Sequence, residues 1–480
     1  MRKIFILLFL VFLIPRLSLI EYIPLKLDEC LYAIMIEEQA ETLTLVPTFF
    51  GYAVWWKPPV FFWVMSFFAQ LLRPMSFLSI EAFYRLPNVL FGFINTVLVY
   101  LVAKHITKDE KFALVNGFVF ALLPLTILVD TSLLIDPLNL MFILASVYLY
   151  LLGEKKNGLF FAGGVFSFLA VLTKLFNALS IPIIIAAYFF QHNRKVLRKR
   201  EFLLSLLFIP AAFLVNYAVY EDKAQASEML LDSFQNKIVG HLSSLSFIYA
   251  SVYPLFALTG VWLALALVGF FKYWKRELVY AAWFALIIFP LVGGTWMVWY
   301  FLPIMPPMVY FASLALAKDE KGKTNTDKFF LVVFALIVLI SILLSSIIFA
   351  TLNEAHTPKK LAGEFIASKE NVLIIGEYGP GIFAYKVLEE KKAGEVLDFG
   401  LVIVLDNNSM IEEFIDDYYG PSGENIRDGN FGPMFYESGI YRKDTNLTEF
   451  DYVVLSNLEE MKLNGSIVFN EGNVTIYKIK

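Results

Sequence analysis

The residues that could do chemistry are carboxylates and a lysine next to long apolar segments. Asp28 and Glu29 lie in "LDECLYA", just beyond the first apolar run, and Lys57 follows in "WWKPPVFFW". Asp130 and Asp136 come later, the second in "LLIDPLNL" ahead of a proline that suits the start of a helix. Ionisable groups at a membrane edge are costly unless they have a partner or a task, so these residues are candidates for a site.

Carboxylates and cations of this kind could move a group from a lipid phosphate to a hydroxyl. A hydroxyl attacks well when a positioned carboxylate accepts its proton, and a phosphate departs more readily when cations neutralise it. Asp28 could be that base, and Lys57, Arg85 and Lys174 could hold the phosphate. The spacing alone fits structural roles equally well, because acidic residues cap helices and cations snorkel to headgroups.

The composition requires a membrane around most of the chain. Of 480 residues, 58% are apolar and only 17% are charged, and the apolar ones form long blocks such as "FFLVVFALIVLISILLSSIIFA". The net charge of −4 is small and unpatterned, which gives no reason to expect a nucleic-acid partner. A single cysteine and four histidines without CxxC or HExxH spacing leave a divalent metal possible but not required.

The apolar blocks predict a polytopic α-helical protein with about eleven transmembrane helices. We expect spans near 3–20, 84–103, 112–128, 133–152, 159–173, 178–190, 202–220, 249–270, 277–292, 299–316 and 329–351. No small-x-small cleavage site follows the first block, so we expect an uncleaved helix and not a signal peptide. The apolar segment 58–75 is short and bounded by prolines, and we expect it to lie at the membrane interface.

Loop charges predict the orientation. With the amino terminus inside, basic loops such as "HNRKVLRKR" and "KDEKGKTNTDK" all become cytoplasmic, as the positive-inside rule requires. The candidate residues and everything after about residue 352 then lie outside the cytoplasm. Sequons at Asn407, Asn446, Asn464 and Asn473 agree with this, and an archaeal plasma membrane fits, with other membranes left open.

The carboxy-terminal part predicts a second domain. Short strand-like runs occur in "NVLIIGEYG", "GLVIVLD", "DYVVLSN", "SIVFN" and "NVTIYKIK", with helical stretches between them. We expect a transmembrane domain at 1–352 and a soluble extracytoplasmic α/β domain at 353–480. "GEYGPG" after the first strand lacks the spacing of a phosphate-binding loop and favours a plain turn.

The order of these motifs resembles the GT-C glycosyltransferases, in the group with the lipid A aminoarabinose transferase and the protein O-mannosyltransferases. The resemblance covers residues 1 to about 316. It is carried, in order, by "DECLYA", "WWKPPVFFW", "FYRLPNVLFG", "LLIDPLNL", "LTKLFNALSIP", "LLDSFQNKIVGHLSSLSFIYASVYPL" and "VWYFLPIMPP". Several degenerate motifs in one order are more specific than any one of them.

The resemblance implies a polyprenyl-phosphate sugar as donor, an unknown lipid, glycan or protein as acceptor, and inverting transfer at the external face. It implies that Asp28 is the catalytic carboxylate, that Asp136 supports the site, and that Lys57 binds the lipid phosphate. Tyr300 would approach the donor, while Glu29 and Arg85 are weaker assignments.

The chain departs from the family pattern near the penultimate span. Trp299 stands where relatives commonly have an arginine, so Lys237 or Lys174 would have to supply that charge to the donor phosphate. His241 lies in the long external loop where related enzymes can place a metal ligand, although a lone loop histidine more often is simple surface.

Other classes of protein stay open as alternatives. A transporter or lipid flippase would be expected to show paired halves and charges near mid-membrane, and neither is visible. The Trp-Trp-Asp-Tyr-Gly signature of an oligosaccharyltransferase is absent from this sequence. A non-catalytic scaffold remains if the acidic positions are only structural.

Overall fold

The computed structural model divides the chain into two compact units. The first comprises 1–20, 54–65 and 85–348, and the second comprises 21–53, 66–84 and 349–480. The structure describes residues 2–49, 52–54, 57–75, 77–175, 177–220, 255, 258–286, 298–317, 339, 343, 346–347, 349–350, 352–354, 357–367, 369, 372–376, 385, 388, 403–405, 451–456, 466–471 and 474–479.

The first unit is helical. Its elements are α1 (Arg2–Leu19), α4 (Ile80–Thr107, mostly in this unit), α5 (Glu110–Leu122), α6 (Pro124–Asp130), α7 (Asp136–Gly153), α8 (Gly158–Thr173), η1 (Asn177–Leu179), α9 (Ser180–His192), η2 (Val196–Arg198), α10 (Arg200–Leu206), α11 (Phe208–Val219), α14 (Val261–Tyr273), α15 (Leu278–Ala285), η4 (Val298–Ile304) and α17 (Met305–Ala317). These helices follow the predicted apolar blocks, and most of the block 329–351 lies outside the described residues.

Four helices in the described part are long and apolar enough to cross a membrane. They are Ile80–Thr107, Asp136–Gly153, Arg200–Val219 and Val298–Leu316. The pair α5 and α6 passes the same test together but bends by 60° at its break, where Pro124 cannot continue the hydrogen-bond ladder of α5. The chain is therefore an integral membrane protein with at least four candidate spans, and the full number of eleven stays a prediction.

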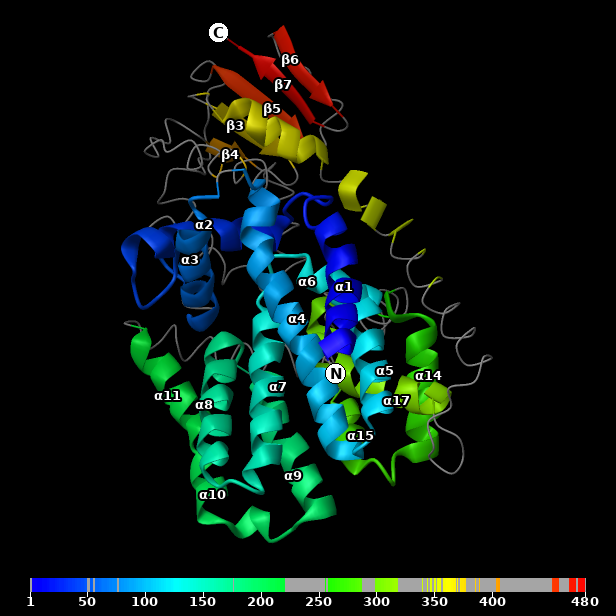
Figure 1. The fold of residues 1–480 in the computed structure, drawn as a ribbon. Coiled ribbons are helices and arrows are strands. Elements are labelled where there is room, and N and C mark those ends of the chain that lie inside the picture. Colours follow the sequence, from blue (N-terminus) through cyan, green and yellow to red (C-terminus); the bar gives the residue numbers. More distant parts are fainter. Residues whose placement is uncertain are drawn as a thin grey trace, which may run out of the picture. The chain divides into compact units, whose positions relative to one another are not determined.

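The helices of the first unit pack closely side by side. Helix α7 lies against α8, α8 lies against α10 and α11, and α14 lies against α17 (Figure 1). Gly269 of α14 faces the backbone carbonyl of Phe311 on α17, where a side chain would collide with the backbone. Small residues at such contacts let membrane helices approach each other closely.

The second unit contains a hairpin of helices from the first predicted external loop. It comprises α2 (Leu27–Thr42), the short strands β1 (Thr48–Phe49) and β2 (Tyr52–Ala53), and the end of α3 (Val60–Leu72). Ser66 donates to the Ile36 carbonyl at 3.0 Å, and Arg73 pairs with Glu37 at 2.6 Å. The Tyr84 hydroxyl donates to the other Glu37 oxygen at 2.8 Å, so α2 is fixed along its side. Helix α3 has only 13 residues, which is compatible with the predicted interfacial position.

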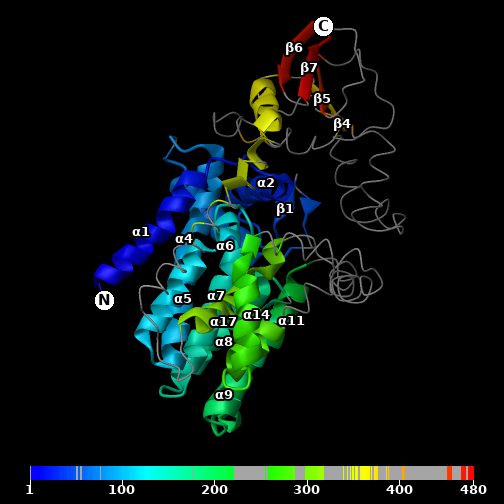
Figure 2. The same ribbon diagram turned by 90° about the vertical axis from the view of Figure 1, so that its right-hand side faces the viewer.

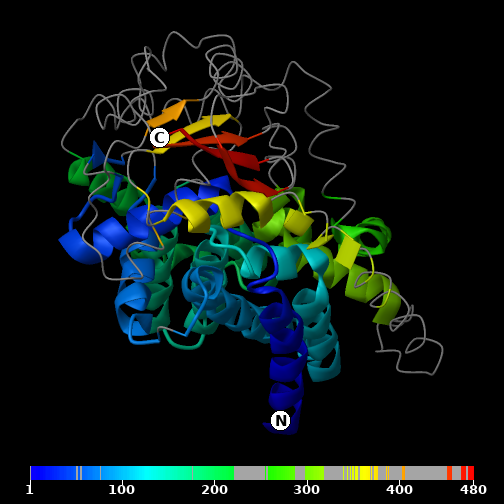
Figure 3. The same ribbon diagram turned by 90° about the horizontal axis from the view of Figure 1, so that it is seen from above.

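The carboxy-terminal part of the second unit holds a sheet. The described strands are β3 (Val372–Gly376), β4 (Ile403–Leu405), β5 (Tyr452–Ser456), β6 (Ser466–Glu471) and β7 (Val474–Lys478), in the order β4-β3-β5-β7-β6 (Figure 3). Strand β3 pairs in parallel with β4 and β5, and β7 pairs antiparallel with β5 and β6. All five strands coincide with the predicted runs.

One helix of the same region contacts the sheet. Residues 357–366 are helical, and the ring of Phe365 packs at a tilt against that of Phe469 on β6, with ring centroids 5.6 Å apart. Strands and helix together give this region mixed α/β character. Figure 2 shows the same elements from a second side. The predicted domain boundary at 352 stays a prediction, because the second unit also includes residues 21–53 and 66–84.

Candidate functional site

A carboxylate and a lysine meet in the first unit at the ends of two helices. Asp136 is the first residue of α7 and is followed by Pro137, as the sequence predicts. Lys174 directly follows the last turn of α8. Lys174 Nζ lies 2.7 Å from Asp136 Oδ1, and while the carboxylate is buried, the lysine side chain stays 21% exposed. Two residues that are 38 positions apart in sequence thus form one charged pair.

The ring of Tyr300 completes this cluster. Tyr300 lies in η4, which packs against α6 and α7, and Lys174 Nζ lies 3.9 Å from the centre of its ring. A cation over an aromatic face is stabilised by the ring quadrupole. We call Asp136, Lys174 and Tyr300 the charged cluster. Because one cation is held by a carboxylate and a ring, and is still partly exposed, the cluster can accept an anionic ligand.

Asparagines of α4 and α7 hold the backbone around the charged cluster. Asn88 donates to the carbonyls of Ser132 and Leu134 at 2.7 and 2.8 Å, and Asn95 donates to that of Pro137 at 2.9 Å. Asn139 donates to the Ala170 carbonyl at 2.8 Å and so connects α7 with α8. Sequence reasoning missed them, although amides inside apolar spans are a signal that could have found them.

Arg85 and Lys57, which the sequence predicts as further contacts to the donor phosphate, also lie in the first unit. Arg85 is fully buried and donates from Nη1 to the Ile20 carbonyl at 2.9 Å. The backbone carbonyl of Lys57 accepts a hydrogen bond from the Tyr220 hydroxyl at 2.7 Å, and the Lys57 residue is half-buried. Their roles toward a donor phosphate stay predictions.

Asp28 and Glu29 lie in the first turn of α2, in the second unit. Glu29 is buried, and its Oε2 accepts the backbone N–H of Lys26 at 3.1 Å, which is the geometry of a helix-capping carboxylate. Asp28 is partly exposed. Of the adjacent pair, Glu29 therefore has a structural task at the helix start, and Asp28 is the better candidate base.

The remaining predicted residues fall outside the described part of the chain. These are Lys237 and His241 in the long loop before α14. Within the described residues, no group of three His, Cys, Asp or Glu side chains is placed to hold a metal ion.

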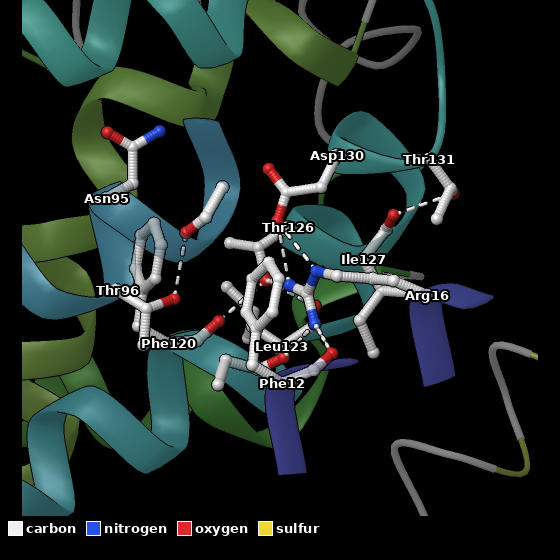
Figure 4. A network of polar contacts seen from close by, with 12 residues as sticks. Phe12, Arg16, Asn95, Thr96, Phe120, Leu123, Thr126, Ile127, Asp130 and Thr131 are labelled. Carbon is white, nitrogen blue, oxygen red and sulfur yellow. Dashed lines mark hydrogen bonds and ion pairs between the residues drawn. The ribbon is translucent and has the colours of Figure 1, made fainter. Parts of the chain in front are cut away.

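Another pair of opposite charges in the first unit is buried on both sides (Figure 4). Arg16 of α1 contacts Asp130 Oδ2 with Nε at 2.9 Å and with Nη2 at 2.8 Å. Arg16 Nη1 also donates to the Ala121 carbonyl at 2.7 Å, near the break between α5 and α6. Thr126 donates to the Leu123 carbonyl at 2.8 Å at the same break. Thr126 Oγ1 also lies 2.6 Å from the Phe120 carbonyl, which loses its helix partner because Pro124 has no N–H to donate.

The sequence of the central region matches a known family. The model of the dolichyl-phosphate-mannose-protein mannosyltransferase family matches residues 56–218, which include the Asp136 and Lys174 positions. No curated protein matches the sequence.

Solved structures match the fold over nearly the whole chain. The chain is similar to ArnT from Cupriavidus metallidurans bound to undecaprenyl phosphate, with a TM-score of 0.64 and 14% identity, covering 99% of this chain and 98% of that one. The apo state of ArnT gives a TM-score of 0.57 at 15% identity, with 99% and 97% covered. The archaeal oligosaccharyltransferase AglB from Archaeoglobus fulgidus, in complex with an inhibitory peptide and a dolichol-phosphate, gives 0.51 at 12% identity, with 94% and 70% covered. The predicted resemblance is confirmed for the fold: the chain has a GT-C fold similar to that of ArnT and AglB, and its residues 56–218 match the mannosyltransferase family model.

Proposed function

We propose that the chain is an integral membrane glycosyltransferase that moves a sugar, with inversion, from a polyprenyl-phosphate-linked donor to an acceptor at the extracytoplasmic face. The observation that carries this proposal is the match of nearly the whole fold to ArnT, an enzyme solved with undecaprenyl phosphate. The mannosyltransferase family model over residues 56–218 supports it independently of the fold. A shared fold supports a shared function by analogy alone, and the charged cluster gives this analogy a chemical basis.

The charged cluster suits recognition of a lipid phosphate. Lys174 is the partly exposed cation, and a phosphate oxygen could share it with Asp136. The Asp136 carboxylate fixes the direction of the Lys174 side chain, so the ammonium is already oriented when the donor arrives. The ring of Tyr300 lies against the same ammonium and restricts the directions from which a phosphate can approach it. Lys57, Arg85 and Lys237 remain proposed further contacts to the donor phosphate.

Asp28 is the proposed base. Its carboxylate would accept the proton of the acceptor hydroxyl as the oxygen attacks the anomeric carbon of the sugar. The bond from that carbon to the phosphate oxygen breaks in the same step, and the polyprenyl phosphate leaves with the electron pair. Cations that neutralise the departing phosphate lower the barrier. A single displacement of this kind inverts the anomeric centre.

The proposed topology follows from the loop charges. About eleven spans with a cytoplasmic amino terminus place α2 and the carboxy-terminal α/β region outside the cytoplasm, most simply at a plasma membrane. The described helices agree in position with the proposed spans.

Similarity to AglB does not favour oligosaccharide transfer. The Trp-Trp-Asp-Tyr-Gly signature of that class is absent from the sequence, in which Lys57 follows the only Trp-Trp pair. A transporter or lipid flippase remains the alternative from another class, and it would bind a lipid phosphate without releasing sugar.

The test is transfer of radiolabelled sugar by the purified protein reconstituted in lipid. A panel of synthetic polyprenyl-phosphate sugars serves as donors, and Asp28→Asn keeps the shape of the side chain but cannot accept a proton. We expect the wild type to release polyprenyl phosphate and the variant to bind donor without turnover. A wild type that binds no donor of this class contradicts the proposed function. Equal turnover in both proteins keeps the enzyme and removes Asp28 as its base.

A further inference from the structure

Glu81, in the first turn of α4, is a buried carboxylate that the carboxy-terminal part of the second unit neutralises. Lys360 Nζ lies 2.7 Å from Glu81 Oε1, and the Tyr385 hydroxyl donates to the same oxygen at 2.8 Å. Lys360 lies in the helix 357–366. A buried carboxylate is costly unless it is paired and hydrogen-bonded, so these contacts hold the first predicted loop and the carboxy-terminal part together.

The Tyr385 hydroxyl also reaches the start of α2. It accepts a hydrogen bond from the Leu25 backbone N–H at 2.5 Å. Leu25 is followed by Lys26, whose own N–H donates to Glu29 in the first turn of α2. Asp28 lies in that turn. One hydroxyl therefore connects a buried carboxylate of α4 with the backbone that leads into the turn carrying Asp28.

The single cysteine of the chain lies at the same place. Cys30 is fully buried on α2, and its Sγ contacts the Leu25 carbonyl at 3.6 Å. Leu25 thus bonds to Tyr385 through its N–H and to Cys30 through its carbonyl. A buried thiol reacts only when its surroundings open, so the modification rate of Cys30 reports on the start of α2.

We propose that Tyr385 and Lys360 are positioning residues which, through Glu81 and the Leu25 N–H, hold the first turn of α2 and so set the place of the Asp28 carboxylate. For the role of Asp28 this rests on the proposed function. It gives the carboxy-terminal α/β region a task in catalysis without any contact to substrate. A catalytic group displaced by about 1 Å can lose roughly 100-fold in rate, so a hold of this kind affects turnover.

The first experiment measures α2 without any need for activity. In the full-length protein reconstituted in lipid, the rate of Cys30 modification by a maleimide is compared between wild type and Tyr385→Phe, which removes only the hydroxyl. We expect modification at least ten-fold faster in Tyr385→Phe. Tyr477→Phe on β7 is the matched control, since Tyr477 is also a buried tyrosine of the carboxy-terminal part, and we expect its rate to equal that of the wild type.

The second experiment measures catalysis on the same proteins. We expect Tyr385→Phe to lower kcat roughly ten-fold with an unchanged KM for the donor, because the base moves while the donor contacts stay. Lys360→Met should act in the same direction, since it leaves the Glu81 carboxylate buried and without its ion pair. Lys360→Arg keeps the charge and should restore kcat, which separates positioning from a general loss of fold.

Each outcome decides the inference. Unchanged Cys30 modification in Tyr385→Phe overturns it, whether or not the protein transfers sugar. Faster modification with unchanged kcat overturns the link to Asp28. If Tyr385→Phe does not fold, the comparison of Lys360→Met with Lys360→Arg gives the same two readouts. If the wild type transfers no sugar from any donor, the proposed function fails, while the Cys30 rate still decides whether the carboxy-terminal part holds α2.

Discussion

Two pairs of opposite charges in the first unit look alike in sequence and differ in their surroundings. In each, an aspartate near a helix end pairs with a cation at 2.7 to 2.8 Å. Arg16 and Asp130 are both fully enclosed. Arg16 Nη1 donates to the Phe12 and Ala121 carbonyls, and Nη2 donates to Thr126 as well as to Asp130. The side chain of Lys174 beside Asp136 stays 21% exposed.

The difference separates a pair that is enclosed by protein from one that solvent can reach. The Arg16 nitrogens all donate to protein oxygens, whereas the Lys174 side chain stays 21% exposed beside its carboxylate. The enclosed pair therefore stabilises the bend between α5 and α6, and the open pair is the one that we propose for a phosphate. Charge within an apolar block does not by itself indicate function.

The largest expected effect is on stability, in the enclosed pair. Arg16→Met leaves the Asp130 carboxylate buried without a partner, which costs about 3–5 kcal/mol. Thermal unfolding in detergent would show it as a large fall in melting temperature. The double variant Arg16→Met with Asp130→Leu should recover most of the loss, because replacing both members of a buried pair by apolar residues is often neutral. A double variant as unstable as the single one would contradict the structural role that we assign to the enclosed pair.

The next effect is on transfer, in the open pair. Lys174→Met should reduce kcat/KM for the donor about 100-fold, or roughly 2.7 kcal/mol. It should also lower the melting temperature, but less than Arg16→Met does, because it leaves the buried Asp136 carboxylate without its ion pair at a place that solvent partly reaches. Lys174→Arg should retain part of the activity. A fall in stability as large as that of Arg16→Met, with normal kcat/KM, would show that Lys174 is structural as well.

A smaller effect is expected at the ring under Lys174. Tyr300→Leu removes the cation–π contact and should weaken donor binding by about 1 kcal/mol, a factor of roughly five, whereas Tyr300→Phe keeps the ring and the affinity. Titration of a fluorescent polyprenyl phosphate into both variants gives the comparison. Equal weakening in the two would assign the contribution to the hydroxyl.

The smallest effect is expected at an exposed pair, Lys104 and Glu110, whose charged atoms lie 3.2 Å apart. Lys104→Gln should leave the melting temperature and transfer unchanged within error, because solvent screens exposed pairs. This variant is the reference for the enclosed pair and the open pair. A clear destabilisation by Lys104→Gln would mean that the exposure of a pair does not indicate its role in this protein.

The elements of the fold follow closely from local sequence pattern, and the contacts between them do not. Short strand-like runs located every described strand of the sheet, and the Asp136–Pro137 dipeptide marked the start of α7. Pro124 lies inside the predicted span 112–128, and the break in that span was not expected although its cause stands in the sequence.

Long-range partners carry no periodic signal. Tyr385 and Glu81 are 304 positions apart, and nothing local in either segment predicts their hydrogen bond. Lys174 appeared equally suited to snorkelling, since only the three-dimensional fold brings Asp136 to it. The candidate residues could thus be named from their types and order, while their partners, and the structural task of Glu29, could not.

The enclosed pair also has a consequence for the way the protein is made. Arg16 precedes Asp130 by 114 positions, so at about 5–20 residues per second its partner is synthesised roughly 6 to 23 s later. An arginine without a partner is unfavourable in hydrocarbon and is tolerated where its long side chain reaches the headgroups. Helix α1 therefore enters the membrane before it has its final neighbour, and it reaches its buried position only after α6 has left the ribosome.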